Sequence, residues 1–386
     1  MAQRLELIGT LALLGAAGAI QFSIAAGQAL IAVAVVCWAA MLLALREPPS
    51  APRFFWPLVV YAGLTILSAV FSPQPRTSII DCKQLVLFLL VPVTYRLVDQ
   101  SRAQTMVTVI VSFAAASAVY GIFQYAILHY DNLGQRPQGS LGHYMTYSGL
   151  LMLVIGAALA RVLFGRRERM WAAMVMPALV VAVALTLTRN AWVGACAAAA
   201  MLLSLKDLRL LAVLPVVAAI FLAIAGTTIT SRFTSMFSLT DPTNRDRVAM
   251  LREGRSMIRT HPLLGVGPNM VEVVYADYRD PDAVQKVNPH LHNVPVQIAA
   301  ERGVPALIVW LTFIVVLVVD LARSFQASDR FLAAAALAGV VSMLAAGMFE
   351  YNFGDSEFLI LFLVLITLPF AAARSTTRNL QSTIHN

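Results

Sequence analysis

The stretch GVPALIVWLTFIVVLVVDLA, residues 303–322, contains a single charged residue, Asp320. An apolar helix of about 20 residues is long enough to cross the hydrocarbon core of a bilayer. The whole chain has the same character: 386 residues, 59% hydrophobic and 12% charged, with a mean hydropathy of +0.75. An average soluble domain is roughly 45–50% apolar and about 25% charged. The composition therefore excludes a soluble enzyme, a disordered chain and a coiled coil, and it predicts an all-α polytopic membrane protein.

About twelve apolar segments are long enough to be membrane spans. They cover residues 6–23, 27–45, 54–71, 84–98, 104–128, 141–164, 170–188, 191–205, 208–229, 303–322, 331–349 and 356–373. The fourth and eighth are short. The only long polar connection is 230–302. We therefore expect transmembrane helices 1–9 in residues 1–229, a large partly helical loop in 230–302, and transmembrane helices 10–12 with a C-terminal tail in 303–386.

The positions of Lys and Arg predict the orientation, because cytoplasmic loops are enriched in both. If the N-terminus is cytoplasmic, fifteen basic residues fall on the inside: Arg4, Arg46, Arg53, Arg96, Arg102, Arg161, Arg166, Arg167, Arg169, Lys206, Arg209, Arg323, Arg330, Arg374 and Arg378. The short outside loops hold only four, Arg76, Lys83, Arg136 and Arg189. This asymmetry places both termini in the cytoplasm and the loop 230–302 on the outside.

The remaining bulk features exclude several partners. A net charge of +8 suits basic cytoplasmic loops and does not by itself indicate nucleic acid. Cys37, Cys82 and Cys196 are far apart, so their spacing fits neither a disulfide framework nor a zinc site. No apolar span has a charge at its centre, which argues against an ion or proton pathway.

Arg247 is the first candidate site residue. Asp241-Pro242-Thr243-Asn244 is typical of a helix start, with Asp246 in the first turn, and a helix to about Thr260 follows. At 100° per residue Arg247 falls in the middle of the apolar face of this helix. A buried arginine there requires an anionic partner. A structural salt bridge or a snorkelling side chain is the alternative interpretation.

Arg189 is the second candidate. It stands between two adjacent spans in Thr188-Arg189-Asn190-Ala191-Trp192, with almost no loop, and is therefore held at the outer interface. The small residues from Gly194 to Ala200 allow close helix packing. Ordinary anchoring beside Trp192 is the alternative for Arg189.

His292 is the third candidate. It stands in PHLHNVPVQ, residues 289–297, where Pro295 fits a first helical turn and places His292 at the helix start. A helix N-terminus disfavours imidazolium, so the ring would stay neutral and able to accept a proton. His290 and His292 alone are weak evidence for a metal, since no nearby Asp or Glu cluster completes a site. A surface histidine is the alternative interpretation.

Several further residues could extend a site. Asn293, Gln297 and Glu301 are four apart and form one polar stripe, so they could orient His292 or hold a substrate. Arg136, beside Pro137 and Gly139, and Lys83 are two more outside basic residues, each equally consistent with a turn or a helix end. Except for the acidic group at 350–357, no outside boundary has paired carboxylates, so a divalent metal site for diphosphate chemistry is poorly supported.

Together these segments resemble the O-antigen ligase and polymerase superfamily of bacterial envelope proteins. The motifs that carry the resemblance are TRNAW at 188–192, Arg247 followed by HPLLGVGP at 261–268, and His292-Asn293 with Gln297 and Glu301-Arg302-Gly303. The resemblance implies a GT-C-like glycosyltransferase in the bacterial inner membrane, with its active site facing the periplasm. It implies transfer of a polysaccharide from undecaprenyl diphosphate to a sugar hydroxyl of lipid A–core, as in lipopolysaccharide biosynthesis.

Such a reaction needs a base for the acceptor hydroxyl and positive charge for the departing diphosphate. His292 is the expected base. Arg189 and Arg247 are expected at the diphosphate, since guanidinium binds phosphate oxygens in bidentate fashion. No cofactor or metal is expected, and direct attack would invert the anomeric configuration. A polymerase that uses a second lipid-linked glycan as acceptor, a lipid-linked glycan flippase and a non-catalytic scaffold are the alternatives.

Overall fold

The computed structural model describes residues 1–238, 240–327 and 329–384, and within these ranges the regular elements are all helical. The elements are α1 (Ala2–Ala19), α2 (Ile24–Leu45), α3 (Phe55–Val70), α4 (Pro75–Asp81), η1 (Cys82–Leu89), α5 (Leu90–Leu97), α6 (Gln100–Ala126), α7 (Tyr144–Phe164), α8 (Arg169–Leu185), α9 (Arg189–Lys206), η2 (Leu208–Ala212), α10 (Val213–Ile224), α11 (Thr227–Thr234), η3 (Ser235–Phe237), α12 (Pro242–Thr260), α13 (Val271–Tyr278), α14 (Val294–Ala327), α15 (Arg330–Gly347), η4 (Asn352–Gly354) and α16 (Ser356–Ile384). The predicted all-α class is confirmed.

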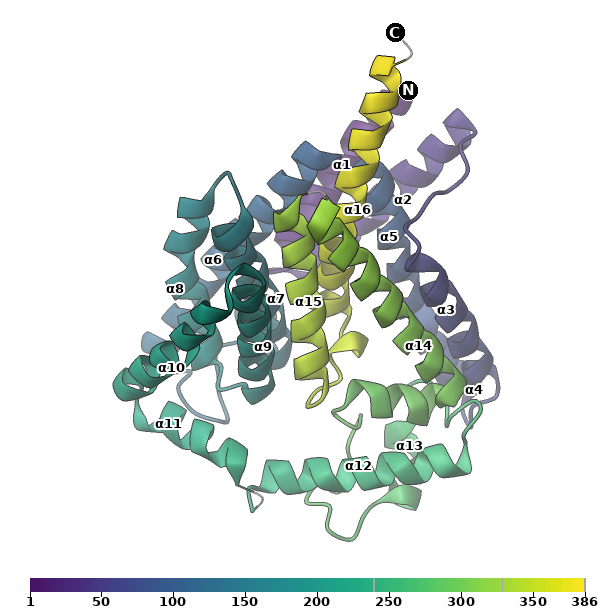
Figure 1. Cartoon of the computed structure of the whole chain (residues 1–386). Helices are drawn as coiled ribbons and strands as arrows, with labels where there is room; N and C mark the ends of the chain where they lie inside the picture. The colour runs from purple at the N-terminus through teal and green to yellow at the C-terminus, as the bar shows by residue number, and fades with distance from the viewer. Residues whose placement is uncertain (239, 328, 385–386) are drawn as a thin grey trace.

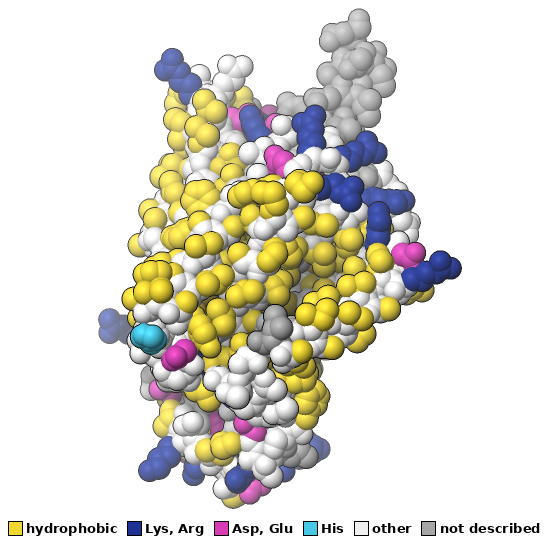
Figure 2. Space-filling view, turned by 90° about the vertical axis from the view of Figure 1, so that its left-hand side faces the viewer, with side chains coloured by type: hydrophobic (Ala, Val, Ile, Leu, Met, Phe, Trp, Pro, Cys, Tyr) yellow, Lys and Arg dark blue, Asp and Glu magenta, His cyan; other side chains and the backbone are white. Residues whose placement is uncertain are grey.

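Seven helical segments of the described chain are long and apolar enough to cross a membrane: Ile24–Leu45, Pro75–Leu97, Gln100–Ala126, Tyr144–Phe164, Val294–Ala327, Arg330–Gly347 and Ser356–Ser375. Three more apolar helices are shorter, Phe55–Val70, Arg169–Leu185 and Leu208–Ile220. Spans in several of the expected places are thus supported, and the count of about twelve stays a prediction. A broad belt of hydrophobic side chains covers the middle of the molecule, between two ends that carry Lys, Arg, Asp and Glu (Figure 2).

The core of the bundle is formed by α7, α15 and α16. More than two thirds of each of these spans is buried within the protein, and α15 packs against α7, α9, α14 and α16. Small residues permit the close approach of α9: a Cβ at Gly194 would lie 2.1 Å from Met152 Sδ and 2.9 Å from the Ser342 carbonyl oxygen. The expected close packing after Arg189 is therefore present, and it holds the start of α9 against the centre of the bundle.

The loop expected at 230–302 lies across one end of the bundle, and the start of α1 and the end of α16 lie at the opposite end (Figure 1). Its longest helix, α12, begins at Pro242 with the side chain of Asp241 as its N-cap. Asp246 is therefore in the second turn, and not in the first as expected. Its buried carboxylate accepts hydrogen bonds from the backbone N–H groups of Val284 and Gln285, both at 3.0 Å. Asp246 thus holds the irregular part of the loop against α12.

The helix expected to restart near His292 runs into the tenth predicted span as one element, α14, with a kink at Gly303. The glycine-rich turn after α12 packs on this kink, where Gly267 N–H donates to the Glu301 carbonyl at 2.8 Å. Gly265 has φ +68°, and a Cβ there would lie 2.2 Å from the Glu301 carbonyl carbon. Only glycine fits so close a backbone contact at positive φ. The turn thereby fixes the loop relative to α14.

Candidate active site at the loop-bearing end of the bundle

Arg189 links the start of α9 to the loop. Its side chain is 4% exposed. Nη2 lies 3.2 Å from Asp241 Oδ1, and Nη1 donates to the carbonyl and hydroxyl oxygens of Ser235, both at 3.2 Å. Burial raises the pKa of Asp241, but the charge and hydrogen bond of Arg189, the Asn244 N–H and the charge of Arg232 together outweigh burial, and the net shift is downward. Asp241 is therefore an internal anion already bound to Arg189, and it also caps α12.

Arg247 lies in the second turn of α12. Its guanidinium carbon is 5.8 Å from the ring centroid of Phe349. Among the described residues no carboxylate lies within 4.0 Å of it, so the expected direct ion pair is absent. Burial lowers the pKa of this arginine, Glu350 and Asp241 raise it, and Arg189 lowers it further. Arg247 is thus a largely buried cation that faces two carboxylates at longer range.

Two more arginines belong to the same cluster. The Arg136 guanidinium stacks over the Tyr144 ring at 4.2 Å, and Arg232 Nε donates to the Leu187 carbonyl at 3.4 Å. Burial lowers the pKa of Arg232, and the neighbouring charges of Arg189, Arg136 and Arg247 help to lower it to about 10. Burial and the charge of Arg189 also lower the pKa of Arg136. The structure thus gathers Arg136, Arg189, Arg232 and Arg247 into one group, which we call the arginine cluster.

Arg232 was not singled out from the sequence, because its surroundings, Thr-Ser-Arg-Phe-Thr, carry no motif. Lys83, in contrast, is exposed on η1, an element that packs with α3, α4, α5 and α16. It is not among the charges that shift the pKa of Arg232 or Arg247. Its role stays a prediction.

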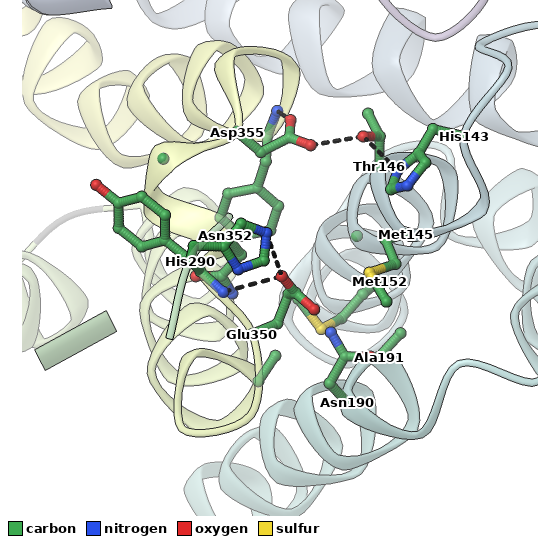
Figure 3. Close-up of a pocket in the computed structure, with 15 residues that line it drawn as sticks. His143, Met145, Thr146, Met152, Asn190, Ala191, His290, Glu350, Asn352 and Asp355 are labelled. Atoms are coloured by element: carbon green, nitrogen blue, oxygen red, sulfur yellow. Dashed lines mark hydrogen bonds and ion pairs between the residues drawn. The ribbon is translucent and has the colours of Figure 1, made fainter. Parts of the chain in front are cut away.

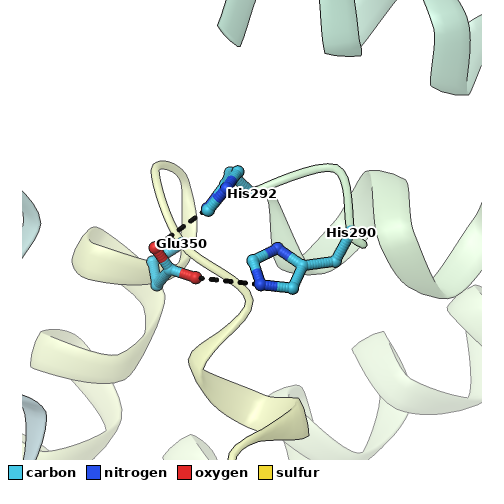
Figure 4. Close-up of side chains that lie close together, drawn as sticks. All are labelled: His290, His292 and Glu350. Carbon is cyan, nitrogen blue, oxygen red and sulfur yellow. Dashed lines mark hydrogen bonds and ion pairs between the residues drawn. The ribbon is translucent and has the colours of Figure 1, made fainter. Parts of the chain in front are cut away.

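His292 lies just before α14 and faces a carboxylate from a distant segment (Figure 4). Its Nδ1 is 2.9 Å from Glu350 Oε2, and His290 Nε2 is 3.8 Å from Glu350 Oε1. Burial raises the pKa of Glu350, but the charge and hydrogen bond of His292, together with His290, bring it down to about 2. Burial lowers the pKa of His290 to about 4. Glu350 is therefore ionised and His290 neutral near pH 7.

The prediction that no carboxylate lies beside His290 and His292 is wrong, because the fold places Glu350 next to both. One ligand atom from each of His290, His292 and Glu350 lies within 4.8 Å of the others. Two imidazoles and a carboxylate are a ligand set that a zinc ion accepts. Without an ion, Nδ1–H of His292 donates to the Glu350 carboxylate, whereas the buried Nδ1 of His290 has no hydrogen-bond partner among the described residues. The geometry therefore permits either a hydrogen-bonded pair of His292 and Glu350 or a metal site.

Asn293 and Gln297 position the segment that carries His292. Asn293 Oδ1 caps α14 by accepting from the Val296 N–H at 3.0 Å, and its Nδ2 donates to the Met348 carbonyl at 3.1 Å. Gln297 Oε1 accepts from the Leu291 N–H at 2.6 Å. Both side chains thus contact the backbone beside His292, and their orienting role stays a prediction.

Glu301, the third member of the polar stripe, is 2% exposed and lies 2.7 Å from Arg302 Nη1. It belongs to a separate buried group at the kink of α14. Its contacts therefore favour an indirect role over direct contact with a substrate.

A cavity of about 210 Å³ adjoins the histidine pair (Figure 3). It lies between the N-terminal ends of α7 and α9, the end of α15 and the start of α16. Its polar lining residues include His143, Thr146, Asn190, Asn352 and Asp355. His290 and Glu350 form part of the same wall. The five polar residues other than His290 and Glu350 were not predicted as site residues from the sequence. They come from three separate segments that only the fold brings together.

Comparison with known proteins gives one family. Residues 175–311 match the family model described as O-antigen ligase. The matched segment contains Arg189, Arg232, Arg247 and His292, whereas Arg136 and Glu350 lie outside it. No curated protein matches the chain.

Proposed function

Because residues 175–311 match the O-antigen ligase family model, we propose that the protein transfers a polysaccharide from undecaprenyl diphosphate to a sugar hydroxyl of lipid A–core. The reaction takes place at the outer, periplasmic face of the bacterial inner membrane. The observation that carries the proposal is the placement of His292, held by Glu350, at the same end of the bundle as the arginine cluster. A base for a hydroxyl and positive charge for a diphosphate are the two requirements of such a transfer.

The base is the free ring nitrogen of His292. Because Nδ1 donates to the ionised Glu350 carboxylate, Nε2 is the ring nitrogen that is left to take the proton of the acceptor hydroxyl. The acceptor hydroxyl gives its proton to Nε2 while its oxygen forms the new bond to the anomeric carbon. Glu350 then stabilises the imidazolium that results. A positioned base of this kind contributes about 10²–10⁴ in rate.

The arginine cluster holds the diphosphate as the bond between the anomeric carbon and the leaving oxygen breaks. The electron pair of that bond stays on the diphosphate, so negative charge develops next to Arg189 and Arg247. Planar guanidinium groups can bind two oxygens each and remain charged when buried. The attack and the departure occur on opposite sides of the anomeric carbon, which inverts its configuration. Positive charge from arginine allows the step to proceed without a metal ion.

Purified protein in lipid nanodiscs, with lipid-linked glycan and rough lipopolysaccharide, tests the proposal. We expect a new glycosidic bond to lipid A–core without ATP, and none with His292→Ala, which should still bind the donor. Products in which one lipid-linked glycan is extended by another would instead identify a polymerase. Translocation of the donor without a new bond would identify a flippase, and near-normal transfer by His292→Ala would remove the base assignment.

A further inference from the structure

The cavity beside the histidine pair is lined in part by polar side chains with atoms that lack hydrogen-bond partners. Asn190, 8% exposed, lines it. His290 also lines it, and the buried Nδ1 of this ring has no hydrogen-bond partner among the described residues. Asn352 is 7% exposed, and its Oδ1 has no partner in the same part of the chain, although its Nδ2 donates to the Met343 carbonyl. Buried polar groups are hydrogen-bonded in most native structures. Two unmet groups on the wall of one cavity therefore indicate a polar ligand.

A buried carboxyl group on the same cavity adds a third contact. Thr146 Oγ1 donates to Asp355 Oδ2 at 2.5 Å, and the Phe358 N–H donates to Oδ1 at 2.9 Å. Burial raises the pKa of Asp355 to about 7. Figure 3 shows Asp355 and Thr146 on one side of the cavity, with Glu350 and His290 facing them. A carboxyl group that is partly protonated near neutral pH can both donate to and accept from a hydroxyl group.

The size and lining of the cavity fit a ring rather than an ion. Its volume of about 210 Å³ is many times the roughly 15 Å³ that one ordered water needs. Apolar side chains, among them Met152 and Phe358, line it together with the amides and carboxyl groups. Alternating hydroxyl and C–H surfaces are the chemistry of a pyranose ring, which presents hydrogen-bonding groups at its edge and apolar faces between them.

We propose that this cavity binds the sugar ring of the acceptor, with Asn190, Asn352 and Asp355 hydrogen-bonded to hydroxyl groups other than the attacking one. The proposal rests on the transfer reaction proposed above. The acceptor is favoured over the first sugar of the donor because the cavity wall includes His290 and Glu350, beside the base. None of His292, Arg189 and Arg247 lines the cavity, and the link to the base is Glu350, which lines it and accepts a hydrogen bond from His292.

Asp355→Asn and Asn190→Ala test the proposal. Asparagine keeps one oxygen to accept from the Phe358 N–H, and its Nδ2 can donate to Thr146 Oγ1, so the fold should persist. We expect the KM for rough lipopolysaccharide to rise about tenfold or more in each variant, as expected for the loss of one or two buried hydrogen bonds. The KM for the lipid-linked donor should change less than twofold. Asp282→Asn is the matched control, because Asp282 is exposed on the loop and remote from the cavity lining.

The same variants are also placed in a His292→Ala background, and binding of rough lipopolysaccharide is measured without donor. Weaker binding in this background supports the cavity assignment independently of turnover. A rise confined to the donor KM would assign the cavity to the donor sugar and overturn the proposal. Unchanged binding and unchanged KM values would show that the cavity holds only water. If wild-type protein binds lipopolysaccharide through Asp355 but transfers nothing, the proposed function fails while the sugar site stands.

Discussion

Glu350 accepts a hydrogen bond from Nδ1 of His292, at 2.9 Å and across 58 residues of sequence. The carboxylate comes from the segment after α15, and the histidine from the segment before α14. Glu350 is buried and ionised, so it is a permanent negative charge on one side of the imidazole. A carboxylate in this position selects the ring tautomer and stabilises the imidazolium that forms when the base takes a proton.

Glu350→Gln should therefore slow transfer by roughly 10²-fold, because a neutral amide neither selects the tautomer reliably nor stabilises the imidazolium. The loss should appear in kcat, with little change in the KM of either substrate. Glu272→Gln, at an exposed position on α13, is the control and should keep wild-type rates. A Glu350→Gln variant with a normal kcat would show that the hydrogen bond to His292 is only structural.

Arg189→Lys and Arg247→Lys should each lower kcat by about 10²–10³-fold, because an ammonium group cannot reproduce the bidentate contact with phosphate oxygens. Arg252→Lys is the matched control on α12. Arg252 pairs with Asp280 and Asp282 and is half exposed, so its replacement should leave the rate unchanged. Full activity in both test variants would mean that charge alone, without guanidinium geometry, is sufficient.

Chelation by EDTA should leave transfer intact if the arginine cluster supplies the positive charge. The triad of His290, His292 and Glu350 makes this test informative, since its geometry would also accept an ion. Initial rates before and after EDTA, with metal content measured by mass spectrometry, provide the check. Loss of activity that zinc or another divalent ion restores would contradict the metal-free mechanism.

Gly265→Ala should destabilise the loop-bearing end. Alanine at φ +68° costs about 1–3 kcal/mol, and its Cβ would lie 2.2 Å from the Glu301 carbonyl carbon. We expect a lower Tm and reduced transfer, because the turn that holds the loop on α14 must shift. Gly226→Ala is the control, since a Cβ there meets nothing within 4 Å. Equal Tm values for the two variants would show that the close contact of Gly265 with Glu301 does not contribute to stability.

The stability of the protein should decline between about pH 4 and pH 7 through Asp355. Its pKa rises from 3.8 to about 7 on folding. The folded state therefore holds more protons than the unfolded state in this window, and stability falls as pH rises through it. Asp355→Asn lacks this titration, so its Tm relative to wild type should increase from pH 4 to pH 8. A constant difference across that range would contradict the shift.

The parts of the site that depend on local sequence could be predicted. The N-cap at Asp241, the helix after it and the helix start near His292 all depend on neighbours within one or two turns. Asn293 and Gln297 were found for the same reason, since their contacts lie within the PHLHNVPVQ segment. The apolar composition determined the helical membrane class. It did not determine the number of spans. Seven helical segments of the described chain are long and apolar enough to cross a membrane, and the three shorter apolar helices do not meet that criterion by length.

What only the tertiary structure decided is which distant side chains meet. Glu350 was recognised in the sequence only as part of an acidic loop, and the fold places it against His292. The fold brings Arg232 and Arg136 close enough to Arg189 and Arg247 for their charges to lower the pKa of Arg232. It also places Asp355 and Asn190 on the wall of one cavity. No local periodicity records such contacts, because they arise from the packing of α7, α9, α15 and α16. The sequence thus determined the helices and the chemistry of the few polar residues, and the packing of the helices decided which of them form one site.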